Sequence, residues 1–257
     1  MIDWQHTYAA IWRKRKAYLR AVHQIDPIDC TQLVGIDGQL SQLRRNTERF
    51  LAGLPANNAL LWGSRGTGKS SLIKALLNQY RDQGLRIIQV DKDDLVDLAD
   101  IVDDIREQSF HFIVFCDDLS FESGEGGYKA LKSVLEGSIE LPPANVLIYA
   151  TSNRRHLLPE QKQDNLDTRI VEGEIHYSDA VEEKISLSDR FGLWVAFYPI
   201  NMDSYLEIVD SYFSCFAGDR VALHEATRLF ALGKASKSGR TAKQFFNQFV
   251  QTTPQAG

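Results

Sequence analysis

The chain lacks most of the features that mark disulfide-rich proteins, membrane-spanning proteins or strongly basic nucleic-acid-binding proteins. Its 257 residues include only three cysteines, Cys30, Cys116 and Cys215, at distant positions. An odd number without close spacing argues against a disulfide framework or a zinc site, and it favours a reducing, cytoplasmic setting. No apolar run reaches the roughly 18–20 residues that a membrane-spanning helix needs, so we expect no membrane insertion.

Positive charge is also scarce overall, since the formal net charge is −5. General affinity for nucleic acid is therefore not the default expectation, although this balance does not exclude a local basic face. Such a cluster occurs near the start of the chain, where WRKRKAYLRAV holds Arg13, Lys14, Arg15, Lys16 and Arg20. A signal peptide would have an apolar segment after its basic residues, and none follows here. Two interpretations stay open: a solvated helix face, or a surface that touches phosphate groups or a membrane.

What the chain has in abundance is alternation between strand and helix patterns. Residues 31–200 contain five apolar runs typical of buried strands, which read NALLWG, RIIQV, HFIVFCDD, NVLIYATSN and WVAFYPI. Helical patterns separate the first four, and a polar segment precedes the fifth. This alternation predicts an α/β fold with a parallel sheet covered by helices on both faces. Before it, we expect residues 1–30 to form a basic helical arm. After it, residues 201–257 show three helical patterns and no strand, which predicts a small helical domain.

A glycine-rich stretch joins the first of these strands to a helical pattern, in LLWGSRGTGKSSLIKALL. Gly63, Gly68, Lys69 and Ser70 satisfy G-x-x-x-x-G-K-S/T in the strand–loop–helix context that a P-loop requires. Glycine lets backbone N–H groups approach phosphate oxygens, and the start of a helix adds partial positive charge there. We expect Lys69 to reach the β and γ phosphates of ATP and Ser70 to ligate Mg²⁺. The predicted nucleotide-binding residues are Gly63, Ser64, Arg65, Gly66, Thr67, Gly68, Lys69, Ser70 and Ser71.

A P-loop needs a second acidic group to hold the metal ion, and the strand HFIVFCDD supplies one. Asp117 ends this apolar run, as a Walker B aspartate does. Because parallel strands end at a common edge of the sheet, we predict that Asp117 and Ser70 lie together. The alternative is that Asp117 only caps a helix after the strand.

With these landmarks the chain resembles an AAA+ ATPase and, within that superfamily, a bacterial family of uncharacterised P-loop ATPases. The likeness runs from LVGID to SGRTAKQF. It implies a three-layer P-loop NTPase sandwich with a five-stranded parallel sheet, followed by a helical lid domain. It also implies that Val34 and Gly35 contact the adenine base.

The same resemblance implies roles for three polar residues. Asn153, at the end of the fourth strand, corresponds to the polar residue that orients water against the γ-phosphate. Arg190 in SLSDRFG is similar to the arginine finger, which acts on the nucleotide of a neighbouring subunit. Arg240 in SGRTAKQF is similar to the arginine that reaches from the lid to the phosphates. The alternatives are, in turn, a plain turn residue, a surface salt bridge and a solvated residue at a helix start.

One position departs from the AAA+ pattern. These enzymes usually carry glutamate directly after the Walker B aspartate, where it polarises the attacking water, whereas this chain has Asp118. Aspartate is one methylene shorter, and it can still act on water; Glu122 is a second candidate. ATP binding is therefore better supported than fast hydrolysis, and we expect slow turnover that depends on assembly.

The resemblance thus implies a Mg²⁺-dependent ATPase that uses ATP to drive conformational change or assembly on a protein or nucleic-acid client. A homo-oligomer is expected, because the finger acts in trans. Two alternatives stay open: a nucleotide-gated binding module with little or no hydrolysis, and a small-molecule kinase. The polar segment 153–179 is a candidate for client contact, but no residue in it names the client.

Overall fold

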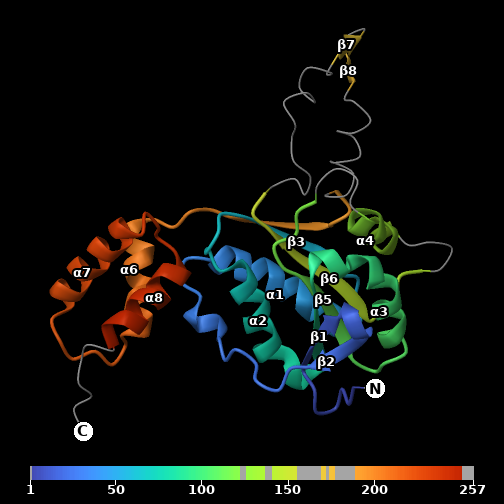
Figure 1. The fold of residues 1–257 in the computed structure, drawn as a ribbon, viewed down its shortest axis with the longest axis horizontal. Coiled ribbons are helices and arrows are strands. Elements are labelled where there is room, and N and C mark those ends of the chain that lie inside the picture. Colours follow the sequence, from blue (N-terminus) through green and yellow to red (C-terminus); the bar gives the residue numbers. More distant parts are fainter. Residues whose placement is uncertain are drawn as a thin grey trace.

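A computed structural model describes residues 2–121, 126–136, 141–154, 169–171, 174–176 and 189–250 of the chain. Figure 1 shows a central sheet with helices on both faces and a group of three helices set to one side. The predicted α/β fold with a mostly parallel sheet is confirmed.

The main sheet has seven strands within the described residues, not the five that we predicted. The five predicted strands are all present and lie parallel in the order β4, β5, β6, β3, β9. Two more strands extend the sheet beyond β4: β1 is parallel to β4, and β2 is antiparallel to β1. The strands are β1 (Ala9–Arg13), β2 (Tyr18–Ala21), β3 (Ala59–Gly63), β4 (Leu85–Val90), β5 (His111–Cys116), β6 (Val146–Ser152) and β9 (Leu193–Phe197). Separately, β7 (Arg169–Val171) pairs antiparallel with β8 (Glu174–His176).

The helical arm predicted for residues 1–30 is wrong, because β1 and β2 form a hairpin joined by a 3-10 turn at Lys14–Lys16. The run of basic residues suggested a helix face, but burial in this segment alternates with the period of a strand. Ala10 and Trp12 are buried, whereas Arg13 is exposed. Pairing with β4 buries the apolar face of the hairpin, and this tertiary contact overrides the local pattern.

Helices cover both faces of the sheet, and each layer has its own apolar core. On one face α1 and α2 bury residues such as Leu43 and Leu72 against the strands. On the other face α3 and α4 do the same with residues such as Ile101 and Leu131. These helices are α1 (Asp37–Leu51), α2 (Lys69–Tyr80), α3 (Leu98–Ile105) and α4 (Gly126–Glu136), and short 3-10 helices occur at Cys30–Gln32, Arg81–Gln83 and Lys92–Asp97.

Three helices follow the sheet, as the three helical patterns within residues 201–257 predicted: α6 (Met202–Tyr212), α7 (Arg220–Gly233) and α8 (Gly239–Val250). They share a core that is separate from those of the sheet, and its aromatic rings surround Phe213. Asn201 caps α6 by accepting a hydrogen bond from the backbone N–H of Ser204 at 2.8 Å. No described helix is both long enough and apolar enough to cross a membrane.

Candidate functional site

The glycine-rich loop, residues 63–70, runs from the end of β3 to the start of α2. Two of its glycines are required by close approach of other backbone or side chains. A Cβ at Gly63 would lie 1.9 Å from the carbonyl oxygen of Phe197, and Gly63 also has a φ of +128°. A Cβ at Gly66 would lie 2.7 Å from the Cβ of Ser238. The loop is therefore held between β9 and the start of α8, which no larger residue at these positions would allow.

Most backbone N–H groups of this loop have no hydrogen-bond partner among the described residues. Ser64 N donates to Phe197 O at 3.1 Å, and Leu72 N donates to Gly68 O at 2.8 Å. Between them, the N–H groups of residues 65–71 donate to no other described residue. A run of unpaired N–H groups at the start of a helix is an arrangement that binds anions such as phosphate.

Lys69 lies inside the loop with only 7% of its surface exposed. Its ammonium group donates to Gly63 O at 2.8 Å, to Ser64 O at 2.7 Å and to the Asn153 side-chain oxygen at 3.3 Å. Burial lowers the pKa of this group, while the nearby Asp117 and Asp118 carboxylates act in the opposite direction. A partly desolvated cation of this kind favours a nearby anionic ligand.

Asp117 and Ser70 meet at the carboxyl edge of the sheet, as we predicted. The Ser70 hydroxyl donates to Asp117 Oδ1 at 2.6 Å. The hydroxyl of Thr151, on the neighbouring strand β6, donates to the same oxygen at 2.6 Å. A serine hydroxyl beside a carboxylate is the donor set that Mg²⁺ prefers, so these residues fit that ion.

Thr151 is a site residue that the sequence analysis missed. Besides orienting Asp117, its hydroxyl accepts the backbone N–H of Asp118 at 2.9 Å, and its side chain is buried. The only signal in the sequence is a threonine inside the apolar strand NVLIYATSN, a position where a polar group needs a partner.

Asp118 and Asn153 are also brought together. The Asn153 side-chain amide donates to Asp118 Oδ1, while its oxygen accepts from Lys69. Asn153 thus connects the loop lysine to the carboxylate after Asp117. Asp118 has a φ of +54°, a left-handed conformation that is uncommon outside glycine. Glu122, the second candidate for acting on water, lies outside the described residues.

The group of three helices contacts the loop, and Figure 1 shows this group to one side of the sheet. The backbone N–H of Gly239, at the start of α8, donates to Gly66 O at 3.0 Å. Arg240 is the next residue and is exposed, so it stands beside the loop. Within the described residues its side chain makes no hydrogen bond or ion pair.

The segment that contains Val34 and Gly35 lies against both the loop and the three helices. A Cβ at Gly35 would come within 3.6 Å of the Ser204 hydroxyl in α6, and a Cβ at Gly68 would come within 3.4 Å of Ile36. Val34 is half-buried, and Gly35 is exposed. The predicted base-binding segment is therefore next to the predicted phosphate loop.

Arg190 is held differently from the other predicted site residues. It forms an ion pair with Glu136 near the end of α4, and each side chain is about a third exposed, at 32% and 33%. Glu136 was not singled out in the sequence, because nothing in the spacing of these two residues links α4 to the start of β9.

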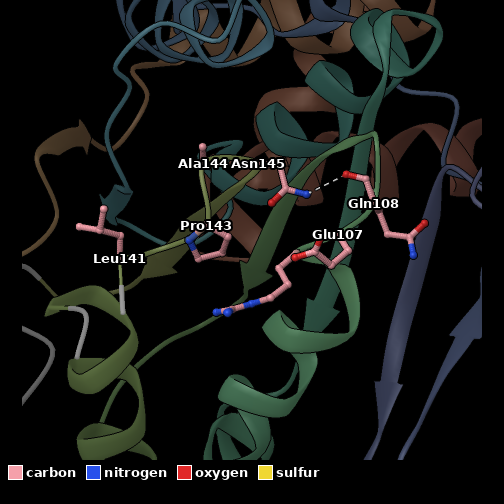
Figure 2. A pocket seen from close by; sticks show the side chains of 7 residues that line it. Glu107, Gln108, Leu141, Pro143, Ala144 and Asn145 are labelled. Atoms are coloured by element: carbon pink, nitrogen blue, oxygen red, sulfur yellow. Dashed lines mark hydrogen bonds between the residues drawn. The ribbon is translucent and has the colours of Figure 1, made fainter. Parts of the chain in front are cut away.

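The protein also has an open hollow of about 370 Å³ at the amino edge of the sheet, far from the loop. Figure 2 shows Asn145 at its back, where the side-chain amide donates to Gln108 O at 3.1 Å. It lies before β6, whereas the glycine-rich loop follows β3, and parallel strands place these ends at opposite edges. The hollow is lined by Arg106, Glu107, Gln108, Leu141, Pro143, Ala144 and Asn145.

These features first define a class. The mostly parallel sheet covered by helices, with the glycine-rich loop between β3 and α2, is the α/β fold of AAA+ P-loop ATPases. A family model described as "Protein of unknown function (DUF815)" matches residues 5–253, and the chain belongs to that family.

Two solved structures with this fold are similar to the chain. One is Orc1 of Aeropyrum pernix in complex with DNA, with a TM-score of 0.56 and 15% identity over 82% of this chain and 58% of Orc1. The other is a mutant of RuvB from Thermotoga maritima, with a TM-score of 0.50 and 13% identity over 87% of this chain and 72% of RuvB. At such identities the likeness establishes the fold alone. No curated protein matches the chain with significant similarity.

Proposed function

We propose that the protein binds ATP with Mg²⁺ in the glycine-rich loop and hydrolyses it slowly within a homo-oligomer. The observation that carries this proposal is the run of N–H groups at residues 65–71 that have no partner in the described part of the chain, next to the buried ammonium of Lys69. A polyphosphate supplies the acceptors that these donors lack, and it supplies the negative charge that Lys69 favours.

In this proposal the loop amides hold the phosphate oxygens, and Lys69 turns from the carbonyls of Gly63 and Ser64 toward the β and γ phosphates. Ser70 and Asp117 would hold Mg²⁺, with Thr151 keeping Asp117 in orientation. The ion, when bound, neutralises charge that develops on the phosphates.

Asp118 is the candidate general base. Its carboxylate would accept the proton of the attacking water, while Asn153, already bonded to both Asp118 and Lys69, would orient that water against the γ-phosphate. Because aspartate is shorter than the usual glutamate and Asp118 has an uncommon backbone conformation, we expect slow proton transfer.

The three helices would act as a lid over the nucleotide. Val34 and Gly35 would contact the adenine base, and Arg240 would reach the phosphates from the start of α8. The contact between Gly239 and Gly66 supports this role, since the lid already bears on the loop. Loss of the γ-phosphate would then change how lid and loop fit together, which would convert chemistry into movement.

Arg190 would act on the nucleotide of a neighbouring copy, after it exchanges Glu136 for phosphate charge. The movement would serve a protein or nucleic-acid client. That Orc1 of the same fold is in complex with DNA supports the nucleic-acid option.

A second function is favoured by Asp118 itself. If its short side chain cannot activate water, ATP would only set the assembly state, and the protein would be a nucleotide-gated binding module. Both functions need the same binding site and differ in turnover alone.

Phosphate release and ATP affinity, measured over a series of protein concentrations, separate the two. We expect specific activity that rises with concentration and falls in Asp118→Asn, whose ATP affinity is retained. Tight binding without phosphate release at any concentration would favour the binding module. No calorimetric response to ATP and Mg²⁺, in the wild type as in Lys69→Ala, would refute both.

A further inference from the structure

We propose that the β1–β2 hairpin is a binding surface for single-stranded nucleic acid. Five of the 29 lysine and arginine residues of the chain fall within positions 13–20, and no acidic residue lies among them. The chain as a whole carries 34 acidic residues and a net charge of −5, so this segment is a local concentration of positive charge.

The hairpin sorts its side chains onto two faces. Ala10 and Trp12 are buried in the sheet core, and Leu19, opposite Trp12, packs against the same core. Arg13 lies directly opposite Tyr18 on the other face. Arg20 shares that face, because it is two residues from Tyr18 on the same strand.

This outer face combines an aromatic ring with positive charge, the two features that bind single-stranded nucleic acid. Tyr18 is 43% exposed, and its two neighbours on this face, Arg13 across the hairpin and Arg20 along β2, are also exposed. An exposed ring offers a surface on which a base can stack, and the neighbouring guanidinium groups can hold the phosphates next to that base. Charged residues on an edge strand also prevent sheet-to-sheet pairing, but that role does not require an aromatic ring between them.

The turn adds charge and is anchored. Lys14 donates to Asp93 O at 3.0 Å and lies 3.8 Å from the Asp94 carboxylate, and Trp12 donates to Asp97 at 3.0 Å. These contacts fix the turn on the 3-10 helix at Lys92–Asp97. Arg15 and Lys16 are exposed, and neither makes an ion pair within the described residues. The turn that carries Arg15 and Lys16 is therefore held in place by its contacts with the 3-10 helix.

The position of the turn connects it to the rest of the site. Since β1 is parallel to β4, the turn projects at the carboxyl edge of the sheet, where the glycine-rich loop also lies. Four strand spacings separate β1 from β3, or roughly 19 Å across the sheet. A nucleic-acid strand bound at the hairpin would lie close enough to the glycine-rich loop to respond to nucleotide-driven movement, and it would not overlap the nucleotide.

A membrane surface and an acidic protein are other partners for basic residues. A membrane-binding tip would carry large apolar side chains, and the turn has none beyond Tyr18. An acidic protein would use the charges but not the stacking position of Tyr18. We therefore assign single-stranded nucleic acid as the occupant.

The test measures fluorescence anisotropy of short labelled DNA and RNA single strands with full-length protein, without nucleotide, over a range of salt concentrations. The variant Arg13→Glu/Arg15→Glu/Lys16→Glu should bind at least about tenfold more weakly, with a salt slope lower by about 2. The matched control, Arg45→Glu/Lys129→Glu/Arg228→Glu, changes the net charge equally at exposed positions elsewhere and should leave the salt slope unchanged.

Stacking is tested separately. Tyr18→Ala should weaken binding by roughly 5- to 150-fold, and Tyr18→Phe should restore it. Thermal unfolding of each variant verifies that the hairpin is still folded. Equal loss of binding in the triple variant and its control would overturn the proposal, as would unchanged binding in Tyr18→Ala. Tighter binding to phosphatidylserine vesicles, polyglutamate or duplex DNA than to single strands would also overturn it.

This inference names a client for the proposed ATPase and in that sense rests on it, but the two can fail separately. Lys69→Ala should abolish ATP binding and leave the affinity for single strands unchanged. If that variant loses both, the hairpin is not an independent surface and the proposal is overturned.

Discussion

The glycine-rich loop and Arg190 occupy the same fold, yet they are supported in different ways. Around the loop, Lys69, Ser70, Asp117, Thr151 and Asn153 contact one another within a single chain. Arg190 instead pairs with Glu136 of α4. In the function proposed above, one chain therefore binds ATP, and turnover needs a second copy toward which Arg190 turns.

The largest effect is expected from removing the ammonium group of Lys69 from the glycine-rich loop. Lys69→Ala should abolish ATP binding, a loss of at least about 100-fold, because Lys69 is the one buried cation of the loop among the described residues. Isothermal titration calorimetry with ATP and Mg²⁺ measures this. Lys74→Ala, on the same helix but exposed and paired with Asp26, is the control and should bind normally.

Removing Arg190 should affect turnover and leave ATP binding intact. Arg190→Ala should bind ATP normally and lose about 1,000-fold in turnover, since the guanidinium acts on transition-state charge. Mixing this variant with Lys69→Ala should restore part of the activity, because each supplies what the other lacks. Failure of the mixture to recover any activity would contradict a finger that acts in trans.

Thr151→Val tests whether the Thr151 hydroxyl supports the proposed metal site by orienting Asp117. It removes a hydrogen bond to the Asp117 carboxylate, worth roughly 1.5 kcal/mol, so affinity for ATP in the presence of Mg²⁺ should fall about tenfold. Thr151→Ser keeps the hydroxyl and should behave as wild type. If affinity falls equally with and without Mg²⁺, Thr151 does not act through the metal site.

A longer side chain at position 118 tests whether the short carboxylate of Asp118 limits turnover. Asp118→Glu should raise turnover by about fivefold, because the carboxylate gains the reach of the usual base. Its ATP affinity should be unchanged. Steady-state phosphate release at fixed protein concentration is the measurement, and equal or lower turnover would show that the length of this side chain does not limit the rate.

The smallest effect is expected where Arg190 is held. Glu136→Gln weakens a partly exposed ion pair worth up to about 1 kcal/mol, so turnover should rise roughly two- to fivefold at limiting concentration. Lys132→Gln removes another basic neighbour of Glu136 and leaves Arg190 paired, so it should not raise turnover. Equal rates in the two variants would show that Glu136 does not restrain Arg190.

Some of the site could be predicted from the sequence because local chain geometry produces it. A strand, a glycine-rich turn and a helix are consecutive, so Gly63, Gly68, Lys69 and Ser70 needed no distant partner to be recognised. Thr151 and Glu136 could not be predicted in this way. Their importance comes from neighbours on other elements, and each looks ordinary in its own segment.

The N-terminal segment shows the same limit for the fold. Its basic run suggested a helix, and only the edge of β4 made it a hairpin, since a strand is stable where a partner strand and an apolar face are available.

By itself the sequence determined five of the seven strands described in the main sheet, the loop, the aspartate at the end of β5 and the three terminal helices. These depend on apolar periodicity and on glycine and lysine spacing, which act over a few residues. The tertiary structure alone decided which strands are neighbours, that the start of α8 bears on Gly66, and that Arg190 pairs with Glu136. Such contacts join residues far apart in the chain, and their energy exists only once the sheet has brought them together.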